Sequence, residues 1–210
     1  MIEDGDSKIQ AFHRNLLLSK EAMAFLNSRG MTLDAISKFA IGWFDIVRAS
    51  KYHRRILFPV RDQNGVLHTF QGRAIDDDNT PKFWHASYDK SKIVYGLYEN
   101  ARAMVGVNRT VLVEGPMDVT ALWQSSIPAV ASFGTAFTFA QACLLRRFVD
   151  NVVIWYDPDE AGEAASIKVF DLLEEAGIRR AYFVSSEYDA AETYRRGGAK
   201  AIHDVLASAQ

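Results

Sequence analysis

Two apolar, β-branched segments in the second half of the chain each end in acidic residues. The first, residues 111–113, runs into Glu114, and the second, residues 152–156, runs into Asp157 and Asp159. A helix-like pattern follows each acidic end, which is typical of a parallel α/β sheet that gathers functional side chains at the carboxyl ends of its strands. The pattern therefore predicts an α/β fold with one acidic site.

The spacing within each acidic cluster favours convergence on one pocket. Asp157 and Asp159 are two residues apart, and residues i and i+2 of an extended backbone point the same way. Glu114 and Asp118 are four residues apart, which places them on neighbouring turns if a helix begins near Pro116. Converging carboxylates repel one another unless a cation lies among them, and Mg²⁺ prefers carboxylate and phosphate oxygens. The spacing predicts a metal-dependent enzyme of phosphoryl transfer.

Each acid alone also has an ordinary structural explanation. Asp159 is explained as the cap of a helix that starts near Glu160, and Asp118 as a first-turn partner of a helix dipole. Two such clusters, each at the end of a strand, favour metal binding over these separate explanations.

Composition narrows the class of protein. With 210 residues, 49% of them hydrophobic, the chain can bury a core in one domain or in two small ones. Cys143 is the single cysteine, which excludes a disulfide framework or a Cys-rich zinc site within the chain. Residues 1–6 are acidic and lack the apolar core of a signal peptide, and no apolar run is long enough to cross a membrane. We therefore expect a cytoplasmic location and no membrane partner.

Basic residues are concentrated in the middle of the chain. The net charge of −2 alone argues against nucleic acid, but residues 48–109 contain eleven Lys and Arg against six Asp and Glu. A basic middle beside an acidic metal site is the layout expected for a protein that binds polyanions while it holds a metal. The alternative is an ordinary solvated surface of mixed charge, which the bulk count does not exclude.

Local patterns predict a basic first half with mixed structure. Residues 1–19 are expected to form a loose lead-in, followed by two short helices capped by Ser19 and Thr32. Strands at 55–60 and 66–70 flank an Asn-Gly pair, which is a hairpin signal. We therefore expect a small mixed α+β basic subdomain over residues 20–108, with a linker near 100–108.

Strands and helices alternate from residue 110 onward, which predicts a mostly parallel sheet flanked by helices over residues 109–210. The expected strands lie at 111–113, 129–132, 152–155 and 181–184, and the expected helices at about 117–124, 140–148 and 161–175. Thr138 and Gln141 have the spacing of a capping box at the start of the middle helix.

Ordered motifs give the chain a family resemblance. Three in the second half resemble the Toprim domain, which also occurs in topoisomerases and some nucleases: Val113-Glu114-Gly115-Pro116-Met117-Asp118, Phe133-Gly134-Thr135-Ala136 and Asp157-Pro158-Asp159-Glu160-Ala161-Gly162. Four upstream are similar to the basic half of a primase core: Arg55-Ile56-Leu57-Phe58-Pro59-Val60-Arg61-Asp62, Phe70-Gln71-Gly72-Arg73, Pro81-Lys82-Phe83 and Tyr95-Gly96-Leu97-Tyr98. The ordered combination, from about residue 20 to 205, resembles the Toprim-type catalytic core of bacterial and phage primases of the DnaG-like family.

The resemblance implies a role for each matching residue. Glu114 would be the central acid, as a metal ligand or a general base, and Asp118 would support it. Asp157 and Asp159, together with Asp189, would complete a site for two Mg²⁺ or Mn²⁺ ions. The positions implied to contact the nucleotide phosphates or the template, with two glycines that allow close backbone approach, are Arg61, Arg73, Lys82, Lys90, Lys92, Gly72 and Gly134.

The chain departs from the family pattern at several points. The family's third acidic motif is Asp-Pro-x-Asp, whereas this chain reads Asp189-Ala190-Ala191-Glu192, with a longer acid at the end. Full primases also carry an N-terminal zinc-binding module and C-terminal helicase-binding regions, whose motifs are absent here. A replicative helicase, or a separate zinc-binding protein for template recognition, is therefore an expected partner. A primase this short suggests a phage or mobile-element origin.

The expected function is that of a DNA primase catalytic core, which makes short RNA primers on single-stranded DNA from ribonucleoside triphosphates. Two alternatives remain open: a Toprim-type nuclease that uses the same acids on a phosphodiester, and a catalytically weak nucleic-acid-binding module. The basic half speaks against the nuclease, because hydrolysis needs no triphosphate site. The intact Glu114, Asp157 and Asp159 speak against the binding module.

Overall fold

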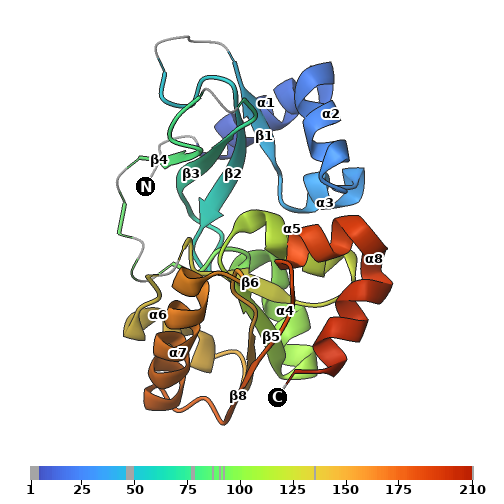
Figure 1. The fold of residues 1–210 in the computed structure, drawn as a ribbon. Coiled ribbons are helices and arrows are strands. Elements are labelled where there is room, and N and C mark those ends of the chain that lie inside the picture. Colours follow the sequence, from blue (N-terminus) through green and yellow to red (C-terminus); the bar gives the residue numbers. More distant parts are fainter. Residues whose placement is uncertain are drawn as a thin grey trace. The chain divides into compact units, whose positions relative to one another are not determined.

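The structure is a computed structural model that describes residues 5–45, 50–76, 79–86, 88–89, 91, 93–134 and 136–209. Its contacts divide the chain into an N-terminal unit, Met1–Tyr88, and a C-terminal unit, Asp89–Gln210 (Figure 1). Each unit is built around its own four-stranded sheet. No helix in the described part of the chain is long and apolar enough to span a bilayer.

Among its described residues, the N-terminal unit combines three helices with an antiparallel sheet in the order β1-β2-β3-β4. Ser19 caps α2 by accepting from the N–H of Ala22 at 3.2 Å, and Thr32 caps α3 by accepting from Ala35 at 3.3 Å, as the sequence predicts. The elements are α1 (Gly5–Leu18), α2 (Lys20–Ser28), α3 (Leu33–Lys38), β1 (Gly42–Phe44), β2 (Arg55–Arg61), β3 (Leu67–Ala74) and β4 (Phe83–His85).

The expected loose lead-in over residues 1–19 is wrong, because α1 occupies most of it. Ile9 and Leu16 of this helix are buried, and the ring of Phe12 packs edge-to-face on that of Phe70 with centroids 5.3 Å apart. These positions recur at helical spacing, so packing against the sheet stabilises a helix with few polar start or stop signals.

The predicted hairpin is confirmed as the pair β2 and β3. Its loop is closed by Asp62, whose Oδ1 accepts from the N–H groups of Asn64 at 2.9 Å and Val66 at 3.1 Å. Gly65 adopts a φ of +85°, which a glycine reaches at little cost.

The C-terminal unit contains a sheet in the order β6-β5-β7-β8, in which every neighbouring pair is parallel. This confirms the predicted α/β class. Thr138 and Gln141 form the predicted capping box of α6. The elements are α4 (Leu97–Val107), β5 (Arg109–Val113), α5 (Pro116–Gln124), β6 (Ala129–Ala131), α6 (Phe139–Arg146), β7 (Asn151–Ile154), α7 (Glu160–Glu175), β8 (Arg180–Phe183) and α8 (Ala190–Ala207).

The expected linker near residues 100–108 is wrong, because these residues form most of α4. Leu97 and Met104 of this helix are fully buried, and the side-chain N–H of Asn100 donates to the carbonyl of Ala129 at 2.9 Å. Since α4 packs on β5 and β6, the contacts place the boundary between the units after Tyr88, earlier than the expected boundary at residue 108.

Candidate functional site

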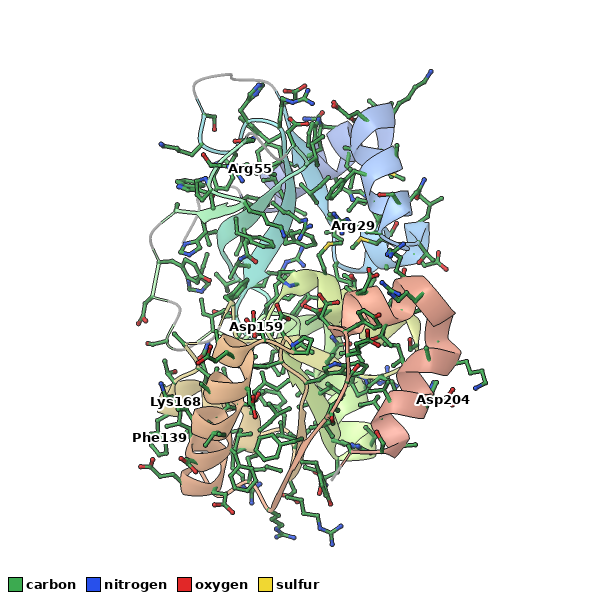
Figure 2. The ribbon with its side chains drawn as sticks, viewed as in Figure 1. Arg29, Arg55, Phe139, Asp159, Lys168 and Asp204 are labelled. Atoms are coloured by element: carbon green, nitrogen blue, oxygen red, sulfur yellow. The ribbon has the colours of Figure 1, made fainter. Side chains whose placement is uncertain are left out.

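The predicted acids lie at the carboxyl ends of the parallel strands. Glu114 directly follows β5, Asp157 follows β7, and Asp189 lies between β8 and α8. Asp118 is in the first turn of α5, and Asp159 caps α7, where it is labelled in Figure 2. Because β5, β7 and β8 are neighbours in one parallel sheet, their ends place these acids along a single edge.

Glu114 is the acid whose environment is most directly set by the others. Its Oε1 accepts a hydrogen bond from the backbone N–H of Asp157 at 3.2 Å. Burial raises the pKa of Glu114 to about 7, and the negative charges of Asp157, Asp159 and Asp189 act in the same direction. A carboxyl group with this pKa exchanges its proton near neutral pH.

Gly162, in the first turn of α7, allows Glu114 and Asp157 to approach that helix. A Cβ on Gly162 would lie 2.2 Å from the carbonyl oxygen of Asp157 and 3.1 Å from Oε1 of Glu114. Gly162 is a site residue that the sequence alone did not predict, although it lies within one of the matching motifs.

Asp118 is buried and is held by the start of α8. Its Oδ1 accepts from the N–H of Ala191 at 3.0 Å, a contact between residues far apart in the chain. Burial raises the pKa of Asp118, and the nearby charge of Asp189 raises it further. Asp118 therefore connects α5 to the N-terminus of α8 and is more than a first-turn partner of its own helix.

Asp159 and Asp189 both cap helices, as the ordinary explanation of Asp159 predicts. Asp159 accepts from the N–H of Gly162 at 2.7 Å, and Asp189 accepts from the N–H of Glu192 at 2.6 Å. Each of these bonds uses Oδ1 and so leaves Oδ2 for another partner. Within the described ranges, no three His, Cys, Asp or Glu side chains are arranged to hold a metal ion together.

Glu192, the longer acid of the third motif, forms ion pairs with two arginines. Its Oε1 lies 2.6 Å from Nη2 of Arg195 and 2.7 Å from Nε of Arg196. Hydrogen bonds from these two side chains lower the pKa of Glu192 to about 2. Glu192 therefore faces cations of its own helix and is not expected to act with the other acids.

Gly134 lies beside Glu114 in the backbone. Its φ is +103°, in the left-handed region that favours glycine, and its N–H donates to the carbonyl of Glu114 at 3.1 Å. The hydroxyl of Ser132 donates to the carbonyl of Gly134 at 2.7 Å and so fixes the turn from the other side.

Arg55, in the basic half, stabilises the fold of the N-terminal unit. Its side chain is 2% exposed, and burial lowers its pKa. It donates to the carbonyls of Lys51 at 2.9 Å and Lys82 at 3.0 Å, and to the side-chain oxygen of Asn79 at 3.0 Å. A Cβ on Gly72 would lie 2.9 Å from Cδ of Arg55, so Gly72 makes room for this arginine.

A series of alternating cations and aromatic rings runs through the N-terminal unit, and we call it the cation–aromatic series. It consists of Arg29, Phe25, Arg73, Phe83 and Lys82. The guanidinium carbon of Arg73 lies 5.6 Å from the ring centroid of Phe25 and 5.2 Å from that of Phe83. Arg29 lies 5.4 Å from Phe25, and Lys82 lies 5.9 Å from Phe83. These distances are within the range of cation–π attraction.

The cation–aromatic series includes residues that sequence reasoning missed. Phe25 and Arg29 lie in α2 and at its C-terminal cap, and the spacing of the chain alone does not connect them with Arg73. Of the other predicted basic positions, Arg61 is half-buried at the end of β2, and Lys90 and Lys92 lie outside the described residues.

Two family models match the chain in the predicted order. Residues 111–194 match a model described as Toprim-like, and residues 45–101 match the N-terminal domain of the DNA primase catalytic core. A DNA primase of Clostridium acetobutylicum is 34% identical over 197 residues, which cover 90% of this chain and 33% of that protein. A DNA primase of Haemophilus influenzae is 30% identical over 245 residues, which cover 97% of this chain and 41% of that protein.

Solved structures give the same match. The zinc-binding and RNA polymerase domains of the Aquifex aeolicus primase superpose with a TM-score of 0.88 at 26% identity, covering 98% of this chain and 60% of that one. A DnaG primase catalytic domain bound to single-stranded DNA gives a TM-score of 0.86 at 28% identity, covering 98% and 77%. The chain spans about a third of the length of the first curated relatives it matches. The chain therefore belongs to the DnaG-like primase family, in which it corresponds to the Toprim-type catalytic core.

Proposed function

We propose that the chain synthesises short RNA primers on single-stranded DNA from ribonucleoside triphosphates, as the catalytic part of a DNA primase. The observation that carries the proposal is the placement of Glu114, Asp157, Asp159 and Asp189 at one edge of the parallel sheet, and the raised pKa of Glu114 supports it. The matched relatives support it, since they are DNA primases and one solved neighbour is bound to single-stranded DNA.

The acids suit a divalent cation in charge and in donor chemistry, although no three of the described side chains are already arranged around one ion. Their mutual repulsion is the kind that a cation relieves, and the carboxylates leave oxygens outside their capping bonds. Glu114, Asp157 and Asp159, with Asp189, would hold Mg²⁺ or Mn²⁺, two ions in all. When bound, these ions supply Lewis-acid chemistry that activates a 3′-hydroxyl and stabilises departing pyrophosphate.

The protein's own residues position and transfer the proton. Where Glu114 is not itself a metal ligand, its pKa of about 7 suits it to accept the proton of the attacking hydroxyl near neutral pH. The N–H of Asp157 fixes the orientation of Glu114. Asp118, through Ala191, fixes the start of α8 and with it Asp189. Asp118 is therefore a positioning residue.

The cation–aromatic series supplies positive charge for the triphosphate. The guanidinium of Arg73 lies within cation–π range of the rings of Phe25 and Phe83, and such contacts reduce the conformational entropy that is lost when it binds an anion. We assign the same role to Lys82 and Arg29. Arg61, Lys90 and Lys92 remain proposed contacts to nucleotide or template, and Gly134 a proposed point of close approach.

Partners are proposed on the same basis. The solved Aquifex aeolicus protein combines zinc-binding and RNA polymerase domains. Cys143, the single cysteine of this chain, cannot form a Cys-rich zinc site. We propose that a zinc-binding module recognises the template together with this catalytic part, and that a replicative helicase recruits the enzyme.

A primer-synthesis assay tests the proposal. The purified chain is incubated with single-stranded DNA, labelled ribonucleotides and either Mg²⁺ or Mn²⁺, and a parallel reaction contains a chelator. Short RNA products that disappear with the chelator are expected. Metal-dependent cutting of the DNA would instead establish the nuclease, and DNA binding that is unaffected by the chelator, without either product, would establish the binding module.

A further inference from the structure

A pocket of about 620 Å³ opens between α7 and β8, next to the acids, and we call it the α7–β8 pocket. Asp157 and Asp159 form the wall nearest the candidate site, and Ile167 and Phe183 contribute apolar surface. Its volume is within the ~300–1,000 Å³ range of small-molecule sites. The proposed proton transfer and triphosphate binding use none of this apolar surface.

The charge of the α7–β8 pocket limits what it can bind. Two further acids, Glu160 and Glu163, line it, and none of its described lining residues is Lys or Arg. Such walls repel phosphate, so the ligand must present an uncharged part to the pocket. The triphosphate of an incoming nucleotide is accordingly excluded.

Phe183 provides a flat surface for such a ligand. Its ring is 37% exposed and stacks on that of Phe170, with centroids 5.3 Å apart and planes 22° apart. Because Phe170 supports one side of the ring, Phe183 is held in place before any ligand arrives. A supported, exposed aromatic ring is the feature on which nucleobases stack, whatever their sequence.

Small polar groups complete the pocket. Ser185 and Ser186 follow Phe183 in the lining, and the hydroxyl of Ser186 accepts from the N–H of Tyr188 at 3.3 Å. Hydroxyl groups beside an apolar surface match a nucleoside, which has a flat base with polar edges.

We propose that the α7–β8 pocket binds the base of the 3′-terminal nucleotide of the primer, stacked on Phe183, with its ribose directed towards Asp157 and Asp159. The proposal rests on the proposed primase function, because it places the attacking 3′-hydroxyl beside the acids. It adds a subsite that contacts the growing strand and that is separate from the cation–aromatic series.

Binding without catalysis tests the pocket directly. Adenosine, which carries no charge, is titrated into the ¹⁵N-labelled chain without metal, and amide shifts are expected in residues 163–167 and 183–186. Phe183→Ala should weaken binding about ten-fold, as the loss of one stacking contact implies, and Phe183→Trp should retain it. Phe139→Ala is the matched control, since Phe139 is 43% exposed in the same unit, at the start of α6 (Figure 2).

Extension of a supplied primer gives the second measurement. On a template, Phe183→Ala should raise the KM for a ribodinucleotide primer about ten-fold and leave the KM for the incoming nucleotide unchanged. Shifts confined to other residues, or equal behaviour of Phe183→Ala and Phe139→Ala, would overturn the pocket while leaving the proposed function intact. Adenosine shifts at the pocket in a chain that makes no primers would support the pocket and count against the function.

Discussion

In the N-terminal unit, hydrogen-bond partners surround the buried Arg55, whereas the C-terminal unit places buried and half-buried charges of one sign together. Arg55 donates hydrogen bonds to Lys51, Asn79 and Lys82 and joins segments of its own unit. Burial raises the pKa values of Glu114 and Asp118 instead, and the negative charges of the acids nearby raise them further. A buried charge that makes its hydrogen bonds within the protein contributes to the fold. Clustered charges of one sign repel one another, and a ligand of opposite charge relieves that repulsion. The comparison therefore predicts that removal of Arg55 mainly affects stability, whereas removal of an acid from the second unit mainly affects activity.

The largest expected effect is on activity, from Asp157→Ala in the C-terminal unit. Primer synthesis should fall by about 100-fold or more, because the acid edge loses a carboxylate that would hold the cation. The rate is measured with labelled ribonucleotides, and the fold is checked by circular dichroism.

Asp204→Ala is the matched control for Asp157→Ala. Asp204 is an exposed acid of the same unit, labelled in Figure 2, and it pairs with Lys200 at 2.5 Å on the surface of α8. Its loss should leave both rate and fold near wild type. Normal synthesis by a folded Asp157→Ala chain would remove Asp157 from the metal site.

The next effect is on stability, from Arg55→Met in the N-terminal unit. Removal of the guanidinium leaves buried carbonyl oxygens without their donor, which should cost about 2–4 kcal/mol of unfolding free energy. Arg54→Met is the matched control, because its neighbour Arg54 pairs with Glu21 and Asp76 and is about one third exposed. Loss of these two partly exposed ion pairs should cost at most ~1 kcal/mol. The unfolding free energies of both variants are measured by calorimetry, and equal losses for both would contradict the structural role of Arg55.

Much of the fold could be predicted because its signals are local. The caps Ser19 and Thr32 and the alternation of strands and helices after residue 110 are all visible in short windows of sequence. The helices that were missed depend on tertiary packing. α4 contains Asn100 and Gly106, and α8 is interrupted at Gly198, where φ is +64°. Because these residues have low helix propensity, the local sequence favours a loop. Burial against the rest of the fold stabilises the helix.

The candidate site also contains some residues that the sequence could predict and others that it could not. Acids at strand ends could be predicted, because parallel strands bring their carboxyl ends to one edge. The need for Gly162 could not, since it arises from a carbonyl oxygen of Asp157 that only the fold brings within 2.2 Å of a Cβ. The ion pairs of Glu192 with Arg195 and Arg196 could be predicted, because residues three and four apart lie on the same face of a helix.

The contrast between the units also predicts a pH dependence in the C-terminal unit. The folded pKa of Glu114 lies above its usual 4.5, at about 7, so the folded state holds this proton more tightly than the unfolded state does. The stabilisation is present at low pH and is lost as the pH rises through about 7. Without metal, Tm should therefore fall as the pH rises from about 4.5, the usual pKa, to about 7, the pKa in the folded state.

Glu114→Gln and added Mg²⁺ sharpen the pH test. The glutamine variant cannot ionise, so its Tm should fall less as the pH rises, and Mg²⁺ should reduce the fall in the wild-type chain by stabilising the carboxylate. Glu175→Gln, at the exposed end of α7, should keep the wild-type profile. Identical profiles for wild type and Glu114→Gln would show that Glu114 is not the group with the raised pKa.

The smallest expected effect comes from Lys82→Ala, which tests whether the N-terminal unit also contains charge that is available to a ligand. Lys82 is exposed and contacts the ring of Phe83, whereas its own carbonyl is held by Arg55. Loss of one exposed charge should raise the KM for ribonucleoside triphosphates about five-fold, or ~1 kcal/mol, with little change in kcat if Lys82 binds substrate and transition state alike. Lys38→Ala, at the exposed end of α3, is the control and should leave both constants unchanged. If the KM of Lys82→Ala equals that of the control, Lys82 contributes only to folding, through its carbonyl. Arg73 and Arg29 would then remain the proposed triphosphate contacts.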